Sequence, residues 1–381
     1  MSKMICIKSI SPMSGGEGES KRAAYLKGVL ESWGFKVRVY DYKDSSKTSR
    51  TNLVVRHGAH GRTIWIVSHM DTVAEGDRGL WKTDPFTAVV KGGKVYGRGT
   101  NDNGQSVIAS MYALKALKEG GFDMKYNFGL VLVADEELGS KYGIQKLLEE
   151  KGLFGSRDMF VVPDSGNSRG DEIEVAEKSI LWLRITVQGK QVHASTPDEG
   201  VNAFRYAAML LGDIDKVLHR KYSRANKLFK PQKSTFEMTK REKNVDSINI
   251  VPGSDISYID CRVLPEYDID MVLRDIKRVA AGARFGKVKV EFEPVQLEKA
   301  APPTGEEAEI VGLMKGKIRE MRGINAKVIG IGGGTCAAYF RRKGFDSVVW
   351  STEDDVAHRP NEYCVIGSMV GDSKVFAALF V

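Results

Sequence analysis

The sequence predicts an α/β fold, in which a mainly parallel sheet is covered by helices on both faces, with a second α+β domain inserted into it. Two observations support this prediction. Short apolar runs alternate with helical patterns near both ends of the chain, whereas apolar and polar residues alternate singly in the middle. In addition, 381 residues exceed what one hydrophobic core usually holds, so we expect two domains.

The strand and helix patterns of the first domain begin near the amino terminus. Apolar residues recur at helical spacing from Gly18 to Trp33, and Gly34 then provides a stop signal. Further along, strands and helices alternate, which predicts parallel strands joined by helical crossovers. We expect helices at 18–33, 106–119 and 141–151, and strands at 36–42, 64–68, 127–133 and 159–163.

The pattern changes near Lys178. We expect strands at 181–187, 247–251, 255–262 and 287–292, and helices at 202–218 and 269–281. This β-α-β-β-α-β order is that of a ferredoxin-like unit. A helix at 306–322 and a strand at 347 then resume the first pattern. The outer domain is therefore expected to be discontinuous, with residues 1–178 and 295–381 on either side of an inserted domain at 179–294.

The net charge of +8 is concentrated in one segment. Between His219 and Lys243 there are nine Lys and Arg residues and two acidic residues, which leaves about +1 for the remainder of the chain. The segment contains Asn226, Pro231 and two serines, so we interpret it as an exposed loop. A nucleic-acid surface is the alternative interpretation. The segment lacks the regular aromatic residues of a base-stacking surface, so we expect no nucleic-acid partner.

The cysteines and apolar runs bear on location. Four cysteines are scattered without a CxxC pair, which gives no disulfide framework and fits a reducing compartment. The amino terminus has too short an apolar stretch for a signal peptide, and no apolar run is long enough to span a bilayer. We therefore expect a soluble cytoplasmic protein without a membrane partner.

Four apolar runs lead to residues that can hold a divalent cation. Each run is short and rich in Val, Ile, Leu and Trp, as are strands of a parallel sheet that is buried on both faces. Because the carboxyl ends of such strands face one crevice, we expect side chains that are far apart in sequence to meet there. The residues that follow these runs are His69, Glu136, Glu137, Asp164 and His358.

Two further carboxylates accompany them. Asp71, two residues after His69, can accept a hydrogen bond from the imidazole edge that faces away from a cation. Asp102 lies on a glycine-flanked turn before a helix and could bridge two ions. The adjacent Glu136 and Glu137 would repel each other at the end of a buried strand unless a cation offset both charges. One glutamate can bind the cation while the other takes a proton from water.

Each residue also has a plain structural interpretation. His69 could be a hydrogen-bonded residue at a strand end, the glutamate pair a solvated helix start, Asp164 an Asx turn, and Asp102 a helix cap. His358 could be an ordinary surface-loop residue. Taken together, however, two histidines and three carboxylates at predicted sheet ends form the nitrogen and oxygen ligand set that suits a pair of zinc-like ions.

Nine motifs, in order along the chain, resemble those of one enzyme family. They are Ser-His69-Met-Asp71-Thr-Val, Trp81-Lys-Thr-Asp-Pro-Phe86, Tyr96-Gly-Arg-Gly-Thr-Asn-Asp102, Asp135-Glu136-Glu137, Val192-His193-Ala-Ser-Thr-Pro197, Asn249-Ile-Val-Pro252, Asp260-Cys-Arg262, Gly333-Gly-Thr335 and His358. The family is the co-catalytic zinc family of succinyl-diaminopimelate desuccinylase, acetylornithine deacetylase, aminoacylase and glutamate carboxypeptidase. The resemblance covers nearly the whole chain, and it implies a zinc-peptidase-like fold with an inserted lid and dimerisation domain.

The resemblance implies a site for two divalent metal ions that share one carboxylate. One ion would be held by His69, Asp102 and Asp164, and the other by Asp102, Glu137 and His358. Zinc is the expected metal, with cobalt and manganese as alternatives. Family members carry a cis peptide bond after the shared aspartate, so we expect one after Asp102.

Catalytic roles follow from the same resemblance. Glu136 would act as general base, taking a proton from metal-activated water and delivering it to the departing amine. Asp71 would support the imidazole of His69. His193, in the inserted domain, would stabilise the tetrahedral oxyanion, often across a dimer interface, so we expect a homodimer that forms through the inserted domain. Without the resemblance, His193 would be read as a loop histidine.

Several residues match positions that contact substrate in relatives. Among them are Asn249 and Arg262, and a guanidinium suits a free carboxylate. Arg262 could equally be a surface charge. The glycine-rich stretch that contains Gly333, Gly334 and Thr335 lacks the spacing of a phosphate-binding loop, so we interpret it as a substrate-cradling loop, as in the family.

Two stretches depart from the family pattern. Thr335 is followed by Cys-Ala-Ala-Tyr rather than Ser-Asp-Ala-Arg, so a polar substrate contact is missing, and Asp102 is followed by Asn-Gly-Gln rather than (Asp/Met)-Lys-Gly. Both departures leave the acyl group and the amino acid open. Cys336 could be a nucleophile, but no Cys-His pairing can be read from the sequence.

The sequence therefore predicts a dinuclear metal-dependent hydrolase that cleaves the amide bond of a small N-acyl amino acid, as a desuccinylase or deacetylase does. A dipeptidase or carboxypeptidase acting on short peptides is the alternative within the family. A non-catalytic binding protein on the same scaffold is the alternative from another class. Loss of Glu136 or of a ligand would mark it, and none is lost.

Overall fold

The computed structural model describes all 381 residues, which fold as two compact units. The first unit comprises Met1–Val175, Pro303–Ile329 and Thr335–Val381, and the second comprises Ala176–Pro302 and Gly330–Gly334. The first unit is therefore discontinuous in sequence. The sequence-based boundaries fall at 178 and 294.

An eight-stranded sheet has the strand order β1-β2-β6-β3-β7-β16-β8-β15. Its four central strands, from β6 to β16, run parallel, whereas β1 and β2 on one side and β8 on the other pair antiparallel. The strands are β1 (Arg38–Lys43), β2 (Ser49–His57), β3 (Thr63–His69), β6 (Asn127–Val133), β7 (Met159–Val162), β8 (Glu172–Glu177), β15 (Lys327–Ile331) and β16 (Ser347–Val349).

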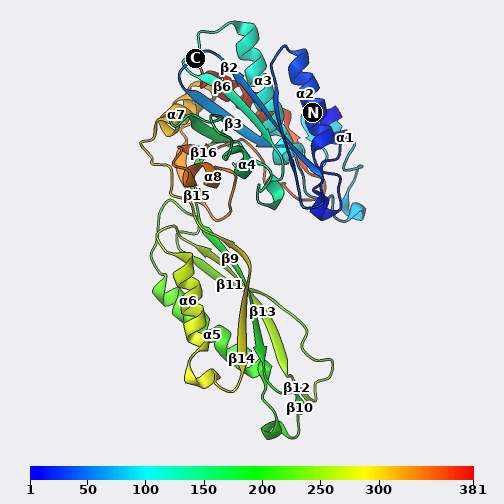
Figure 1. Cartoon of the computed structure of the whole chain (residues 1–381), viewed down its shortest axis with the longest axis vertical. Helices are drawn as coiled ribbons and strands as arrows, with labels where there is room; N and C mark the ends of the chain where they lie inside the picture. Colours follow the sequence, from blue (N-terminus) through cyan, green and yellow to red (C-terminus); the bar gives the residue numbers. More distant parts are fainter. The chain divides into compact units, whose positions relative to one another are not determined.

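Helices cover both faces of this sheet (Figure 1). They are α1 (Ser2–Cys6), α2 (Ser20–Ser32), α3 (Gln105–Gly120), α4 (Ile144–Leu147), α7 (Glu309–Arg322), α8 (Ala337–Arg342) and α9 (Ile366–Ala378). On one face, Phe160 of β7 stacks on Phe340 of α8, with ring centroids 3.8 Å apart. On the other face, Phe128 of β6 stacks on Phe380, just after α9, at 4.3 Å. The predicted mainly parallel sheet between helical layers is therefore confirmed.

The central strands are apolar throughout because both of their faces are covered. Every residue of β3 and β6 is buried, including the terminal His69. Burial of this kind explains the short continuous apolar runs in the sequence. A small antiparallel sheet with the order β17-β5-β4 lies apart from the large sheet, and its strands are β4 (Val89–Lys91), β5 (Lys94–Tyr96) and β17 (Tyr363–Val365).

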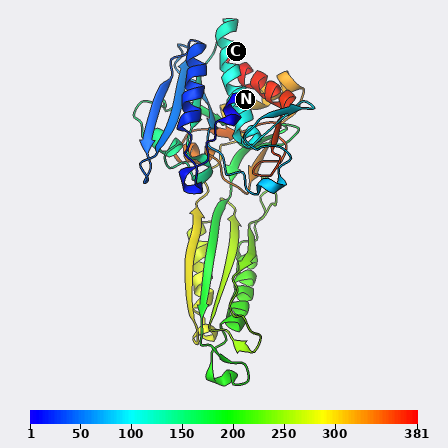
Figure 2. The same ribbon diagram turned by 90° about the vertical axis from the view of Figure 1, so that its right-hand side faces the viewer.

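The second unit is a four-stranded antiparallel sheet with the order β11-β13-β9-β14. Two helices lie on one face of it (Figure 2). Apolar residues of alternate positions in β9 pack with these helices to form the core of the unit. The elements are β9 (Ser179–Gln188), α5 (Ala203–Lys221), β11 (Thr235–Arg241), β13 (Ser254–Val263), α6 (Ile269–Ala280) and β14 (Lys289–Glu298). The chain order is the expected β-α-β-β-α-β.

One strand of this unit was assigned to the wrong residues. The basic segment expected to be an exposed loop contains the end of α5 and the edge strand β11, which pairs antiparallel with β13. Most residues of β11 are exposed and several are charged, so the segment lacks the alternation of apolar and polar residues by which a strand is recognised in a sequence. The strand expected at 247–251 is instead the short β12 (Ile250–Val251), which pairs only with β10 (Val192–His193).

Several elements of the first unit were also missed or shortened. The helix expected at 141–151 is only the single turn of α4. The sequence did not predict β2, β8, β15 or α9, whose short or mixed patterns carry no clear periodicity. None of the helices combines the length and the apolar character that a membrane span requires.

Candidate metal centre

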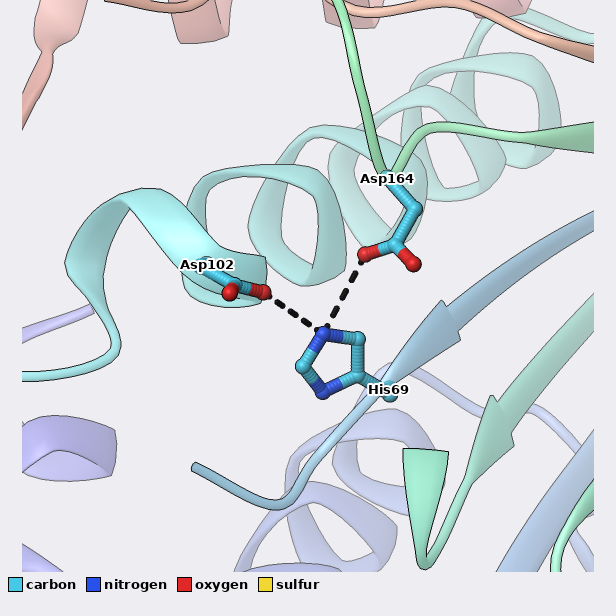
Figure 3. Close-up of side chains that lie close together, drawn as sticks. All are labelled: His69, Asp102 and Asp164. Atoms are coloured by element: carbon cyan, nitrogen blue, oxygen red, sulfur yellow. Dashed lines mark hydrogen bonds and ion pairs between the residues drawn. The ribbon is translucent and has the colours of Figure 1, made fainter. Parts of the chain in front are cut away.

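His69 ends β3 at the carboxyl edge of the parallel strands, and its side chain is buried. Its Nδ1 lies 3.0 Å from the backbone carbonyl oxygen of Asp71. A carbonyl can only accept a hydrogen bond, so Nδ1 carries the proton and Nε2 faces the site. Nε2 lies 2.7 Å from Oδ1 of Asp102 and 3.2 Å from Oδ1 of Asp164 (Figure 3).

Asp102 lies on a tight turn before α3, at Thr100–Gly104. The turn closes through a hydrogen bond of 3.1 Å from the Gly104 nitrogen to the Gly99 oxygen. A Cβ at Gly104 would lie 2.2 Å from that oxygen, so the close approach requires glycine. The peptide bond between Asp102 and Asn103 is cis, as expected.

The second group of side chains forms on the other side of Asp102. Nε2 of His358 lies 2.9 Å from Oδ2 of Asp102 and 3.1 Å from Oε2 of Glu137. The other oxygen of Glu137 accepts a hydrogen bond of 3.1 Å from the Val73 nitrogen, which fixes the carboxylate. The two oxygens of Asp102 are thus divided between the two histidines. Five residues that are up to 289 positions apart in the chain therefore form two adjoining groups of possible ligands.

Glu136 precedes Glu137 on a short turn after β6, and neither of the two groups of possible ligands includes it. Burial, and then the charge of Asp164, raise the pKa of Glu136 well above its usual value. The turn is held by Asp71, whose Oδ1 and Oδ2 accept hydrogen bonds of 3.1 Å from the nitrogens of Glu136 and Glu137. Asp71 was expected to bond to His69. Its carboxylate instead lies 3.5 Å from Nδ1, and the backbone carbonyl makes the shorter contact.

Together the two groups contain three carboxylates and only two histidines, so their negative charge is not fully balanced. Burial raises the pKa of both Glu137 and Asp164. Hydrogen bonds that His358 donates to Asp102 and Glu137 raise its pKa to about 10. The pKa of Asp102 is lowered because the charges and hydrogen bonds of His69 and His358 outweigh its burial. Protons are therefore held where negative charge has accumulated, and divalent cations could replace them.

The donor set fits divalent metal ions of the zinc type. Each group offers one imidazole nitrogen and two carboxylates, all with ligand atoms within 4.8 Å of one another. Zinc is commonly bound by such nitrogen and oxygen donors, with a position left open for water or substrate in catalytic sites. No thiolate takes part. Burial raises the pKa of the nearby Cys336 well above its usual value, so a reactive thiolate is disfavoured there.

Sequence reasoning missed the residues that hold the turn with Asp102. Oε1 of Glu362 accepts hydrogen bonds from the nitrogens of Asn101 (2.9 Å) and Asp102 (3.1 Å), and Oε2 accepts one of 2.6 Å from Arg98. Nδ2 of Asn103 donates to Oδ1 of Asp164 at 2.8 Å. Glu362 follows His358 by four residues, but nothing in that spacing marks its role, because its partners come from a distant turn.

His193 and Asn249 lie close together in the second unit. His193 pairs with Ile250 in the β10–β12 ribbon, and the nitrogen of Ala194 donates to the carbonyl oxygen of Asn249 at 2.9 Å. Both side chains are exposed. Nδ1 of His193 lies 2.6 Å from the hydroxyl of Ser195.

Arg262 lies elsewhere in the second unit, on β13. Its guanidinium donates to both oxygens of Asp260, at 2.7 and 3.0 Å, and to the carbonyl oxygen of Gly332 at 2.9 Å. The guanidinium of Arg262 was expected to bind a substrate carboxylate, but here it binds the carboxylate of Asp260. Gly333 and Gly334 belong to the same unit, whereas Thr335 lies in the first unit and accepts a hydrogen bond from the nitrogen of Ala337.

Comparisons with known proteins identify the family of the chain. The model of peptidase family M20/M25/M40 matches residues 65–381. An uncharacterized metallohydrolase of Methanococcus maripaludis is 37% identical, with 98% of this chain and 96% of that protein covered. A succinyl-diaminopimelate desuccinylase of Rickettsia rickettsii is 23% identical, with coverages of 96% and 94%.

Solved structures share the fold. Aminopeptidase PepT of Bacillus cereus superposes with a TM-score of 0.77 at 19% identity, covering 99% of this chain and 95% of that chain. A dinuclear metal-binding peptidase of family M20 from Bacillus subtilis has a TM-score of 0.68 at 14% identity, with coverages of 99% and 94%. Because the family model spans most of the sequence and a relative at 37% identity matches over nearly its full length, the chain belongs to peptidase family M20/M25/M40.

Proposed function

We propose that this metallohydrolase cleaves the amide bond of an N-acyl amino acid, such as an N-succinyl or N-acetyl amino acid, with two bound zinc ions. Cobalt or manganese could replace zinc. The observation that carries the proposal is the division of the Asp102 oxygens, at 2.7 and 2.9 Å, between two histidines in separate ligand groups. A carboxylate so placed can bridge two cations. In this proposal His69 and Asp164 complete one metal site, and Glu137 and His358 complete the other.

The two cations would polarise the amide carbonyl and lower the pKa of a water molecule. Glu136 accepts the proton of that water at its carboxylate and delivers it to the amide nitrogen as the carbon–nitrogen bond breaks. Its raised pKa suits this task, because a more basic carboxylate takes a proton from water more readily. Asp71 keeps Glu136 and Glu137 in separate positions by binding both of their backbone nitrogens.

The resemblance of the sequence to the family supports the roles proposed for the second unit. We assign oxyanion stabilisation to His193 and contact with the substrate to Asn249 and Arg262. A substrate carboxylate would have to replace Asp260 at the guanidinium of Arg262. The stretch that contains Gly333, Gly334 and Thr335 would border the substrate.

A homodimer that forms through the inserted domain, and a cytoplasmic location, belong to the same proposal. Dimer formation would let His193 of one copy serve the site of the other. The four cysteines are unpaired, which supports a reducing compartment.

A dipeptidase or carboxypeptidase is the second candidate. The solved structures of similar fold include an aminopeptidase and a peptidase of family M20, which supports short peptides as alternative substrates.

An activity panel tests the proposal. The protein is stripped of metal with a chelator, reloaded with zinc, cobalt or manganese, and offered succinylated and acetylated amino acids beside dipeptides. Hydrolysis of the N-acyl amino acids in preference to dipeptides is expected. Hydrolysis of dipeptides alone would establish the second candidate, and failure to cleave any amide with any of the three metals would contradict both.

A further inference from the structure

Glu353 is a carboxylate beside the metal centre that the mechanism above does not use. It follows β16 by four residues, and its backbone nitrogen donates a hydrogen bond of 3.1 Å to the carbonyl oxygen of Asn167. It therefore lies beside the turn that carries Asp164. The two turns approach closely, because a Cβ at Gly166 would lie 2.0 Å from the carbonyl oxygen of Ser351. The site of Glu353 is thus built by loops that also position a proposed metal ligand.

The side chain of Glu353 is held by neutral groups only. Its Oε2 accepts hydrogen bonds from the hydroxyl of Ser351 at 2.8 Å and from Nε2 of Gln105 at 3.2 Å. No lysine, arginine or histidine pairs with it. Burial raises the pKa of Glu353 to about 8, and the charges of Asp102 and Asp164 act in the same direction. A carboxyl group in these surroundings holds a proton unless another positive charge takes its place.

Gln105 gives an independent sign of a missing partner. It is the first residue of α3, three positions after Asp102, and only 1% of its surface is exposed. Its Nε2 donates to Glu353, but its Oε1 has no hydrogen-bond partner. Buried acceptors without a donor are rare in folded proteins. A ligand that brings both a positive charge and several N–H groups would satisfy Glu353 and Gln105 together.

We infer that Glu353 and Gln105 form a subsite for an ammonium group of the substrate, next to the proposed metal site of His69, Asp102 and Asp164. The inference rests on the proposed function, because it specifies the substrate of that same site. An ammonium group carries three N–H donors and one positive charge. Two sources can supply it: the α-amino group of a short peptide, or the side-chain amino group of an N-acylated diamino acid. Gln105 also occupies a position at which the sequence departs from the family pattern.

Two pairs of isosteric substrates separate these sources. N-acetylornithine is compared with N-acetylnorleucine, in which a methyl group replaces the side-chain ammonium. Alanylalanine is compared with isobutyrylalanine, in which a methyl group replaces the α-ammonium. The zinc-loaded enzyme should have a kcat/KM at least tenfold higher for the ammonium member of one pair. The pair that shows the preference identifies the source.

The variant Glu353→Gln should reduce that preference at least tenfold. Glutamine can still accept hydrogen bonds from Ser351 and Gln105, so the fold should persist, but it lacks the charge. Glu307→Gln, at an exposed glutamate of the same unit, is the matched control. If Glu353→Gln fails to fold, Gln105→Met provides a second variant, which removes the unpaired acceptor at similar volume and should lower the same preference.

Other outcomes are equally decisive. Hydrolysis without a preference in either pair, or with a preference unchanged in both Glu353→Gln and Gln105→Met, overturns the inference and leaves the proposed function intact. Loss of bound zinc from Glu353→Gln relative to Glu307→Gln, measured by elemental analysis, would make Glu353 a metal ligand and also overturn it. If neither these substrates nor any other substrate of the activity panel is cleaved, the proposed function fails. The same pairs are then titrated calorimetrically as ligands, and equal affinity within each pair overturns the inference as well.

Discussion

Asp71→Asn is the substitution whose effect can be worked out most fully from the geometry. Asp71 is fully buried, and each of its carboxylate oxygens accepts one backbone hydrogen bond of 3.1 Å, from Glu136 and Glu137. Asparagine keeps one acceptor oxygen and turns an NH2 group toward the other backbone N–H. One of the two bonds is therefore replaced by a contact between two donors, and the turn that carries Glu136, the proposed general base, loses part of its support.

The expected loss of activity follows from the energy of that bond. A hydrogen bond to a charged group contributes about 1.5–3 kcal/mol. Each 1.36 kcal/mol of transition-state stabilisation corresponds to about a tenfold change in rate. If the displaced turn affects the transition state fully, kcat/KM should fall about 10- to 150-fold. Bound metal should remain, because the backbone carbonyl of residue 71, which contacts Nδ1 of His69, is unchanged.

The assay measures kcat/KM on the best substrate of the panel, together with zinc content and thermal unfolding. Asp77→Asn is the matched control. Its carboxylate also accepts a backbone hydrogen bond, of 2.8 Å from Gly79, but it lies on the surface. An Asp71→Asn enzyme that holds both zinc ions and works within threefold of the wild type would refute the reasoning that this carboxylate positions the two glutamates.

Three further predictions concern the same centre. Glu136→Gln should retain both metal ions yet lose about 10²–10⁴-fold in kcat, because its amide cannot take the proton, and near-normal turnover would argue against the general-base role. In the chelated protein the pKa of Glu137 and Asp164 is raised and that of His358 is raised to about 10. Such groups stabilise the fold below their unfolded pKa and lose this effect as pH rises through the folded pKa. The free energy of unfolding should therefore fall as the pH rises from about 5 to about 10, where His358 loses its proton. Bound zinc should increase the free energy of unfolding, measured by denaturant titration, and reduce its dependence on pH. A metal-free protein as stable at the upper pH as at the lower would contradict the assignment. His193→Ala should lower the rate without changing metal content, and mixing it with the Glu136→Gln protein should restore activity if His193 acts across a dimer, whereas unchanged activity of His193→Ala would remove it from the mechanism.

The sequence predicted the elements whose burial is uniform or strongly periodic. The apolar runs of β3 and β6 are continuous because both faces of the sheet are covered, so they could be recognised without any structure. The edge strand β11 could not be recognised from the sequence. Most of its residues are exposed and several are charged, and its place is set by pairing with β13 rather than by its own pattern.

The site could be predicted in outline for a similar reason. Residues that end parallel strands meet at one edge, which brings His69 and Asp164 together from the topology alone. The supports of the site could not be predicted, because they depend on contacts between distant turns. Glu362 reaches the backbone at Asp102 across 260 positions, and Glu353 meets Gln105 across 248. Neither glutamate differs in sequence from an ordinary loop residue.

The most direct test of the account is a crystal structure of the zinc-loaded protein with anomalous data at the zinc edge. Two anomalous peaks about 3.5–4 Å apart are expected, one at each oxygen of Asp102, with Glu136 bound to neither. A single peak, or peaks outside the two groups that contain His69 and His358, would contradict the claim that this carboxylate bridges two cations.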